Sequence, residues 1–193
     1  MTAKGKKRYL PMLVLIAFCI CITTGAVFVY KYINTHQHNK ITSDPLYNVA
    51  LTADVDSLAV NKKARDMMVY NKGKLLKKYK ISLGAQPVGA KHFEGDNKTP
   101  EGNYYISVKN AGSKYHKSLG ISYPNESDRR LAKKNNRLTG GDVMIHGIPN
   151  GYKGKVPDYV GIDWTAGCIS VTDSQIDELF AHVKMRTPIT ILP

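Results

Sequence analysis

One stretch of the chain organises the rest: residues 142–171 read DVMIHGIPNGYKGKVPDYVGIDWTAGCISV. It begins with an apolar run, Val143-Met144-Ile145, which predicts a buried strand that ends in His146-Gly147. A loop rich in glycine, proline and tyrosine comes next and leads to Thr165-Ala166-Gly167-Cys168-Ile169. This loop is long enough to bring the strand end back beside the cysteine, so we expect His146 and Cys168 to be neighbours in space.

Cys168 is predicted to be a nucleophile and His146 its base. A thiol attacks well only as the thiolate, and histidine is the usual proton acceptor because its pKa lies near the working pH. Gly167 lets the backbone approach a substrate closely, and adjacent N–H groups could hold a developing oxyanion. Spacing alone leaves a second interpretation open, namely a buried structural thiol and a strand-end histidine that is satisfied by packing.

The hydrophobic pattern outside this stretch is that of a mainly β domain. Period-two alternation with short turns predicts an antiparallel meander of three strands, in which Lys77 interrupts the apolar face of the third. The expected strands are residues 58–60, 67–69, 75–83, 104–108, 142–146 and 187–192. Residues 84–100, with three glycines and two prolines, are expected to form a loop.

Two helices are expected in this domain. Thr172 and Gln175 fit a capping box, and apolar residues at helical spacing continue from Asp173. A second, weaker helical pattern covers residues 127–135. The chain shows no internal repeat and no low-complexity tract, so one domain accounts for these elements.

The N-terminus predicts a membrane anchor. Residues 9–30 carry no charged side chain, and as a helix they would rise about 33 Å, enough for a hydrocarbon core of about 30 Å. Basic residues precede them, which predicts a cytoplasmic tail at residues 1–8 and export of the chain beyond the apolar run. We therefore expect an anchor at residues 9–30, a polar linker at residues 31–53 and a catalytic domain at residues 54–193.

A cleaved signal peptide is the alternative to the anchor. The small residues Thr24 and Ala26 suit a cleavage site, but the apolar run continues beyond them through Val27-Phe28-Val29. A lipidation signal is disfavoured because bulky residues precede Cys19 and Cys21. The domain is exported under either interpretation.

Charge and cysteine content restrict the partners. The net charge of +13 favours polyanions, but nucleic acid has no support beyond charge and export makes it remote. Cys168 is alone in the exported part, which indicates a thiol that is buried or kept free for chemistry. His36 and His38 lack a third ligand nearby, so no metal and no cofactor is predicted.

The two motifs together resemble the signature of the L,D-transpeptidase family (the YkuD-type catalytic domain): His-Gly, a loop, then Ser/Thr-x-Gly-Cys-Ile/Val. The similarity extends over about residues 56–192. Supporting motifs are Gly95-Asp96, Thr99-Pro100-Glu101-Gly102, Ser118-Leu119, Tyr123-Pro124-Asn125 and Gly140-Gly141. The resemblance implies a β-rich catalytic fold of mixed sheets with one or two short helices, which acts on peptidoglycan.

The resemblance also implies roles for individual residues. Such enzymes attack the carbonyl before the terminal D-alanine of a tetrapeptide stem and pass the acyl group from a thioester to an amine or to water. Cys168 would be the nucleophile and His146 the base, with Gly167, Thr165 and Gly147 as oxyanion and support residues. Tyr152, Tyr159 and Trp164 are candidates for the substrate groove, with simple packing as the other interpretation.

The sequence departs from the family pattern at two positions. Many members have histidine where this chain has Ala166, and arginine or asparagine where it has Ser170. Arginine there could pair with a substrate carboxylate. Lys91, Lys114 and Arg137 are candidate replacements for that charge, although each is otherwise interpreted as a solvated surface cation.

The leading hypothesis is therefore a cell-envelope cysteine acyltransferase that forms or remodels crosslinks in peptidoglycan. Its partners would be stem peptides and, through the anchor, the membrane. A hydrolase of the same fold, either a carboxypeptidase or an amidase, differs only in using water as the acceptor. A non-catalytic wall-binding protein is the alternative from another functional class.

Overall fold

The computed structural model describes residues 23–33, 44–154 and 159–193. The chain divides into two units, Met1–Pro45 and Leu46–Pro193. Residues 23–33 are helical, and within the described ranges no helix combines the length and apolar character needed to span a bilayer. The predicted basic tail, most of the predicted anchor, and the part of the linker with His36 and His38 lie outside the described residues.

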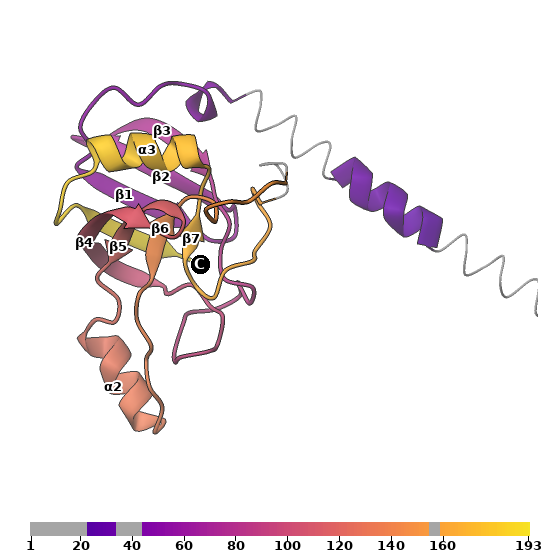
Figure 1. Cartoon of the computed structure of the whole chain (residues 1–193). Helices are drawn as coiled ribbons and strands as arrows, with labels where there is room; N and C mark the ends of the chain where they lie inside the picture. Colours follow the sequence, from indigo (N-terminus) through magenta and orange to yellow (C-terminus); the bar gives the residue numbers. More distant parts are fainter. Residues whose placement is uncertain (1–22, 34–43, 155–158) are drawn as a thin grey trace, which may run out of the picture. The chain divides into compact units, whose positions relative to one another are not determined.

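The second unit is built on one mixed sheet, whose described part has eight strands in the order β3-β2-β1-β8-β4-β5-β6-β7 (Figure 1). The strands are β1 (Ser57–Asn61), β2 (Asp66–Asn71), β3 (Lys74–Lys80), β4 (Gly102–Ser113), β5 (His116–Ile121), β6 (Met144–His146), β7 (Ile169–Ser170) and β8 (Pro188–Leu192). The β1–β8 and β6–β7 pairs are parallel, and the other neighbours are antiparallel. The helical elements are η1 (Pro45–Tyr47), α2 (Glu126–Lys134) and α3 (Asp173–His182).

The sheet curls until its two ends meet. Ser82, just after β3, exchanges two backbone hydrogen bonds of 2.9 Å with Ser170 of β7. A second bridge joins Gly84 to Thr165, where the Thr165 N–H donates to the Leu83 carbonyl at 3.1 Å. We call these paired segments, residues 82–85 and 165–170, the seam. The seam closes the sheet through the segment that leads to Cys168.

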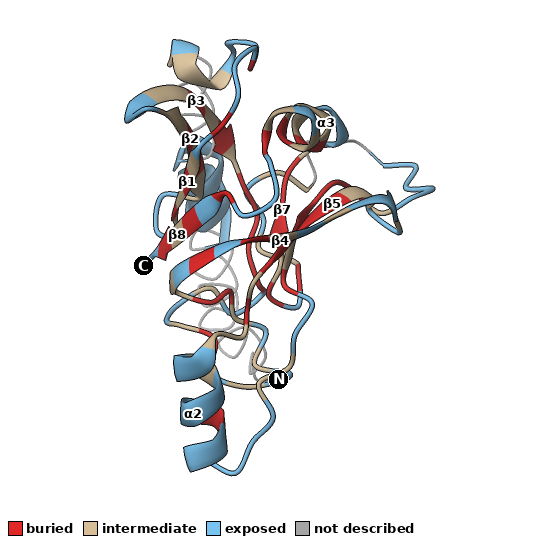
Figure 2. Cartoon of the chain, turned by 90° about the vertical axis from the view of Figure 1, so that its left-hand side faces the viewer, coloured by how far each residue is buried: buried red, intermediate tan, exposed pale blue. Residues whose placement is uncertain are grey.

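The inner faces of the strands and of α3 form the core, shown as buried residues in Figure 2. Leu58, Val60, Met67 and Val69 are all buried, as the alternation predicts. Lys77 is buried too, on the face that the sequence assigns to apolar residues. Its Nζ lies 2.6 Å from a Glu178 carboxylate oxygen of α3, so an ion pair replaces the missing apolar contact.

The predicted meander is confirmed as β1-β2-β3, although the third strand ends at Lys80 rather than at residue 83. Both predicted helices are confirmed. The Thr172–Gln175 capping box begins α3, and α2 begins one residue earlier than predicted, after the N-cap Asn125. Strands β5 and β7 were not predicted from the sequence.

Candidate active site

The two motifs meet on neighbouring parallel strands. Strand β6 ends at His146, and β7 pairs with it in a register that sets Ile145 opposite Ile169 and His146 opposite Ser170. Cys168 immediately precedes β7. The strand that carries the histidine and the turn that carries the cysteine are therefore adjacent in the sheet.

A hydrogen-bonded turn holds Cys168 at the start of β7. The Thr165 hydroxyl donates to the Cys168 carbonyl at 2.7 Å and accepts from the Gly167 N–H at 3.1 Å. Gly167 has a φ of +132°, and a Cβ at this position would lie 2.6 Å from the Lys98 carbonyl oxygen. Only glycine fits this conformation and this space without a shift of the backbone.

His146 is buried, with 4% of its surface exposed, and its own neighbour orients it. Its Nδ1 lies 2.8 Å from the Gly147 carbonyl oxygen. With the proton on Nδ1 this contact is a hydrogen bond, which leaves Nε2 as the basic nitrogen. A Cβ on Gly147 would lie 2.5 Å from an Asp173 carboxylate oxygen, so glycine is needed here as well. The sequence did not identify this orienting carbonyl.

A row of aromatic rings continues from the imidazole. Tyr115 stacks on His146 with ring centroids 4.4 Å apart, and Trp164 approaches its edge at 5.7 Å. Tyr159 lies 5.0 Å from Trp164, and Tyr152 lies 4.4 Å from Tyr159. The structure thus brings the three predicted groove residues together in one row, in which Trp164 contacts His146 and the two tyrosines follow. Tyr115 was missed, because it stands in no motif and reaches the site only through the pairing of β5 with β6.

Burial affects both members of the pair. Burial raises the pKa of the Cys168 thiol, while a backbone hydrogen bond from Met144 and the charge of Lys91 act to lower it. Burial also lowers the pKa of His146. The thiol donates to the Asp142 carbonyl at 3.5 Å. Both shifts favour a neutral thiol and a neutral imidazole in the free protein. The proton is therefore expected to leave sulfur during attack on a substrate rather than before it.

We expect the rate of Cys168 alkylation by iodoacetamide to rise with pH, with a midpoint above the ordinary thiol value of 9.0. The reason is that burial disfavours the thiolate, which is the form that reacts. Intact-protein mass measured over a pH series gives the rate, and a Cys168→Ala variant corrects for Cys19 and Cys21. A plateau of high reactivity below pH 7 would instead indicate a thiolate–imidazolium pair in the free protein.

The three candidate cations differ in their surroundings. Lys91 is only 6% exposed, and its Nζ lies 2.8 Å from an Asp96 carboxylate oxygen, so the surface interpretation is wrong for this residue. Lys114 is exposed. The Arg137 guanidinium lies 4.3 Å from the centroid of the Phe93 ring. Of the three, Lys91 is the one whose charge reaches Cys168, and Asp96 already compensates it.

In the described part of the chain, no group of three or more His, Cys, Asp or Glu side chains could hold a metal ion.

The family model of the L,D-transpeptidase catalytic domain (YkuD) matches residues 56–191. The chain belongs to this family. The resemblance predicted from the two motifs is therefore confirmed, and the mainly β fold agrees with it.

The proteins that this chain resembles are longer than the part that matches it. "Putative L,D-transpeptidase YafK" of Escherichia coli is 34% identical over 111 residues, which are 56% of this chain and 37% of that protein. The crystal structure of the helical cell shape determining protein Pgp2 from Campylobacter jejuni matches with a TM-score of 0.55 and 26% identity, over 81% of this chain and 54% of Pgp2. Bd1075 of Bdellovibrio bacteriovorus matches with a TM-score of 0.51 and 22% identity, over 74% of this chain and 52% of Bd1075, and shows the fold alone. The chain spans about half or less of each of these proteins.

Proposed function

We propose that this L,D-transpeptidase-family protein is a cysteine acyltransferase of the cell envelope that acts on peptidoglycan stem peptides. The observation that carries the proposal is the β6–β7 pairing, which sets His146 beside the strand that directly follows Cys168. Family membership supports a cell-wall substrate. The hydrogen-bonded turn around Thr165 and Gly167 supports a nucleophile held in one position.

In the proposed first half-reaction, Cys168 Sγ attacks the carbonyl carbon before the terminal D-alanine, and its proton passes to His146 Nε2. The N–H groups of Gly147 and Gly167 are already engaged, by the Tyr115 carbonyl and the Thr165 hydroxyl. We therefore assign the oxyanion to the Cys168 N–H. The carbon–nitrogen bond then breaks, the His146 proton moves to the departing amine, and D-alanine leaves a thioester on Cys168.

In the second half-reaction an amine of another stem peptide attacks the thioester. His146 accepts a proton from this amine and returns one to the sulfur, so a new amide forms and the free thiol is restored. Water in place of the amine would give a shortened stem and no crosslink. Residues 9–30 would anchor the protein, with residues 1–8 inside and residues 31–53 as the linker to the exported domain.

Incubation of the full chain with purified tetrapeptide muropeptides tests this proposal. We expect crosslinked dimers and one released D-alanine for each new bond, detected by chromatography and mass spectrometry. Shortened monomers without dimers would identify a hydrolase. Unchanged muropeptides, with retained binding to the wall, would contradict the enzymatic proposal and favour a binding protein.

A further inference from the structure

Helix α2 and the loop after it carry a concentration of positive charge. Five basic residues lie in residues 126–139: Arg129, Arg130, Lys133, Lys134 and Arg137. The two acids of the helix are already engaged, since Glu126 pairs with Arg130, while Asp128 caps the helix and accepts from the Tyr104 hydroxyl at 3.0 Å. Most of this charge is therefore uncompensated within the helix.

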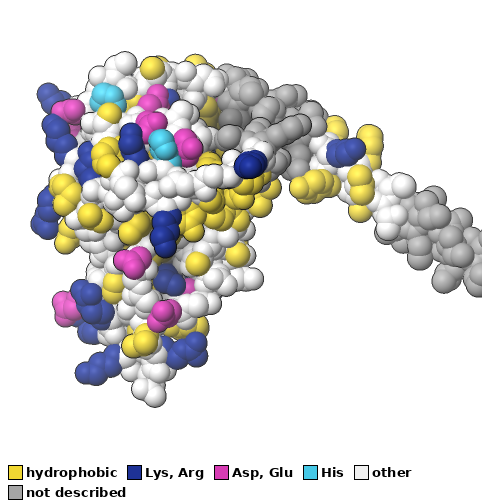
Figure 3. Space-filling view, in the orientation of Figure 1, with side chains coloured by type: hydrophobic (Ala, Val, Ile, Leu, Met, Phe, Trp, Pro, Cys, Tyr) yellow, Lys and Arg dark blue, Asp and Glu magenta, His cyan; other side chains and the backbone are white. Residues whose placement is uncertain are grey.

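The helix stands apart from the core. Ala132 is its one buried residue, and Figure 2 shows the rest of α2 largely exposed. The space-filling view shows Lys and Arg side chains around the end of the domain where α2 lies (Figure 3). The cations of α2 therefore lie on an exposed surface rather than against the core.

A hollow of about 390 Å³ opens between α2 and the loop after it. Three cations line it, Arg129, Lys133 and Arg137, together with the polar side chains of Asn136 and Thr139. No ion pair to any of these three cations occurs within the residues that the structure describes. Stacking of the Arg137 guanidinium on the Phe93 ring restrains that cation at the rim. The lining therefore offers several unpaired donors to an anion.

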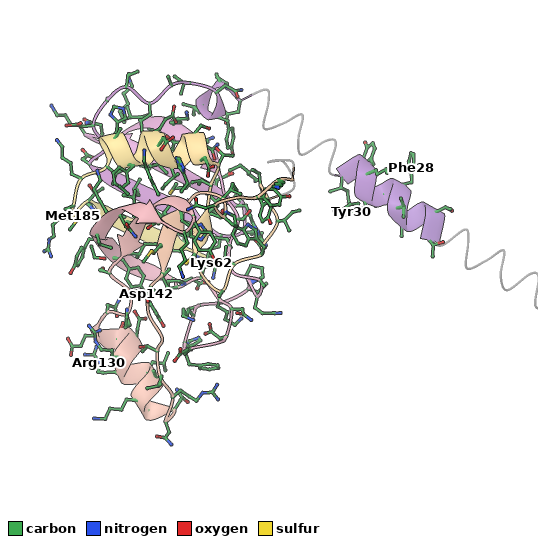
Figure 4. The ribbon with its side chains drawn as sticks, viewed as in Figure 1. Phe28, Tyr30, Lys62, Arg130, Asp142 and Met185 are labelled. Atoms are coloured by element: carbon green, nitrogen blue, oxygen red, sulfur yellow. The ribbon has the colours of Figure 1, made fainter. Side chains whose placement is uncertain are left out.

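The hollow lies close to the candidate active site along the chain. Thr139 lines it, and Asp142, three residues later, offers the carbonyl that accepts from the Cys168 thiol. Three extended residues span at most about 10 Å. Figure 4 labels Asp142 where the chain returns from α2 towards the sheet. A polymer bound at the thiol could thus reach these cations with a neighbouring part of its length.

We propose that this hollow is an exosite for peptidoglycan, in which Arg129, Lys133 and Arg137 bind the carboxylates of peptides that neighbour the stem at Cys168. The inference rests on the proposed function, because it takes its ligand from the same polymer. Guanidinium groups suit carboxylates, which they can hold through two parallel hydrogen bonds. Leu131 of α2 and Leu138 of the loop after it, 38% and 75% exposed, give this region too little apolar surface for insertion into a lipid bilayer.

The test compares two double variants of the full chain with equal loss of charge. Arg129→Gln/Lys133→Gln removes two cations of the hollow, and Lys63→Gln/Lys74→Gln removes two exposed cations near the β1–β2 and β2–β3 turns. Both are made in a Cys168→Ala background and pelleted with sacculi from which phosphate polymers have been stripped. We expect the first to bind about fivefold to tenfold more weakly than the second. Methyl esterification of the sacculus carboxylates is expected to abolish this difference.

Equal binding by the two variants, or a difference that survives esterification, would overturn the exosite. So would a difference seen with phosphatidylglycerol vesicles but not with sacculi, because it would assign α2 to a membrane. With native Cys168, both double variants are expected to turn over soluble muropeptides at the same rate. A slower rate in the α2 variant would instead place the hollow within the active site. Absence of turnover in every version counts against the proposed function only, because pelleting is measured without catalysis.

Discussion

Turnover of tetrapeptide muropeptides is expected to fall to background, a loss of at least about 10⁴-fold in kcat, when Cys168 is replaced by alanine. The substitution removes the proposed nucleophile, and the Thr165 hydroxyl of the same turn is engaged by the Cys168 carbonyl and the Gly167 N–H. The hydrogen bonds of the Thr165 hydroxyl with the Cys168 carbonyl and the Gly167 N–H do not involve the sulfur, so they remain. We therefore expect the thermal unfolding midpoint to change little.

Product analysis by mass spectrometry measures the loss of turnover, and intact-protein mass checks the intermediate. The native chain should show a transient acyl adduct, and the Cys168→Ala variant should show none. A matched variant, Cys19→Ala/Cys21→Ala, removes two other cysteines and should retain native turnover. Measurable turnover by Cys168→Ala above the no-enzyme control would contradict the thioester mechanism.

Replacement of His146 by alanine is expected to lower kcat by about 10²- to 10⁴-fold, the usual contribution of a general acid–base group. In the proposed mechanism the neutral imidazole is the base, and burial lowers its pKa, so the acid limb of the native pH–rate profile should lie below pH 6.5. Activity is lost as the pH falls through this lowered pKa, because the protonated ring cannot accept the thiol proton. The variant should lack that limb.

The control for His146 is His92→Ala, which changes an exposed histidine of the loop before β4. It should keep both the native rate and the native acid limb. His146→Gln tests packing, since it fills more of the space beside Tyr115 and Trp164 than alanine does. If His146→Gln were as active as the native chain, His146 would be a packing residue rather than the base.

Local patterns account for the parts of the fold that the sequence predicts well. The alternation of Leu58 and Val60 with polar neighbours, and the capping box of Thr172, act within a few residues. Strand β7 escaped prediction because it has two residues and depends on partners at Ile145 and Ser82. Strand β5 escaped because its first half, His116-Lys117-Ser118, shows no apolar alternation.

The candidate site shows the same contrast between residues marked by a local pattern and residues placed by distant partners. Cys168 and His146 were predicted because each stands in a recognisable motif, whereas Tyr115 acquires its position from strand pairing alone. The burial of Lys91 was not predicted either, since it requires Asp96 to fold back and provide the carboxylate. Side chains whose roles depend on long-range register or on a buried partner give no signal in a single sequence.

The continuity of the sheet depends on its C-terminal strand, β8. β8 is the last strand along the chain, yet it lies between β1 and β4, so it joins the meander to the other strands at the end of the meander away from the seam. Without residues 188–192, β1 would lose its parallel partner and β4 would lose one of its two neighbours. A chain shortened before residue 188 is therefore expected to lose the continuous sheet between the meander and the strands that carry His146 and Cys168.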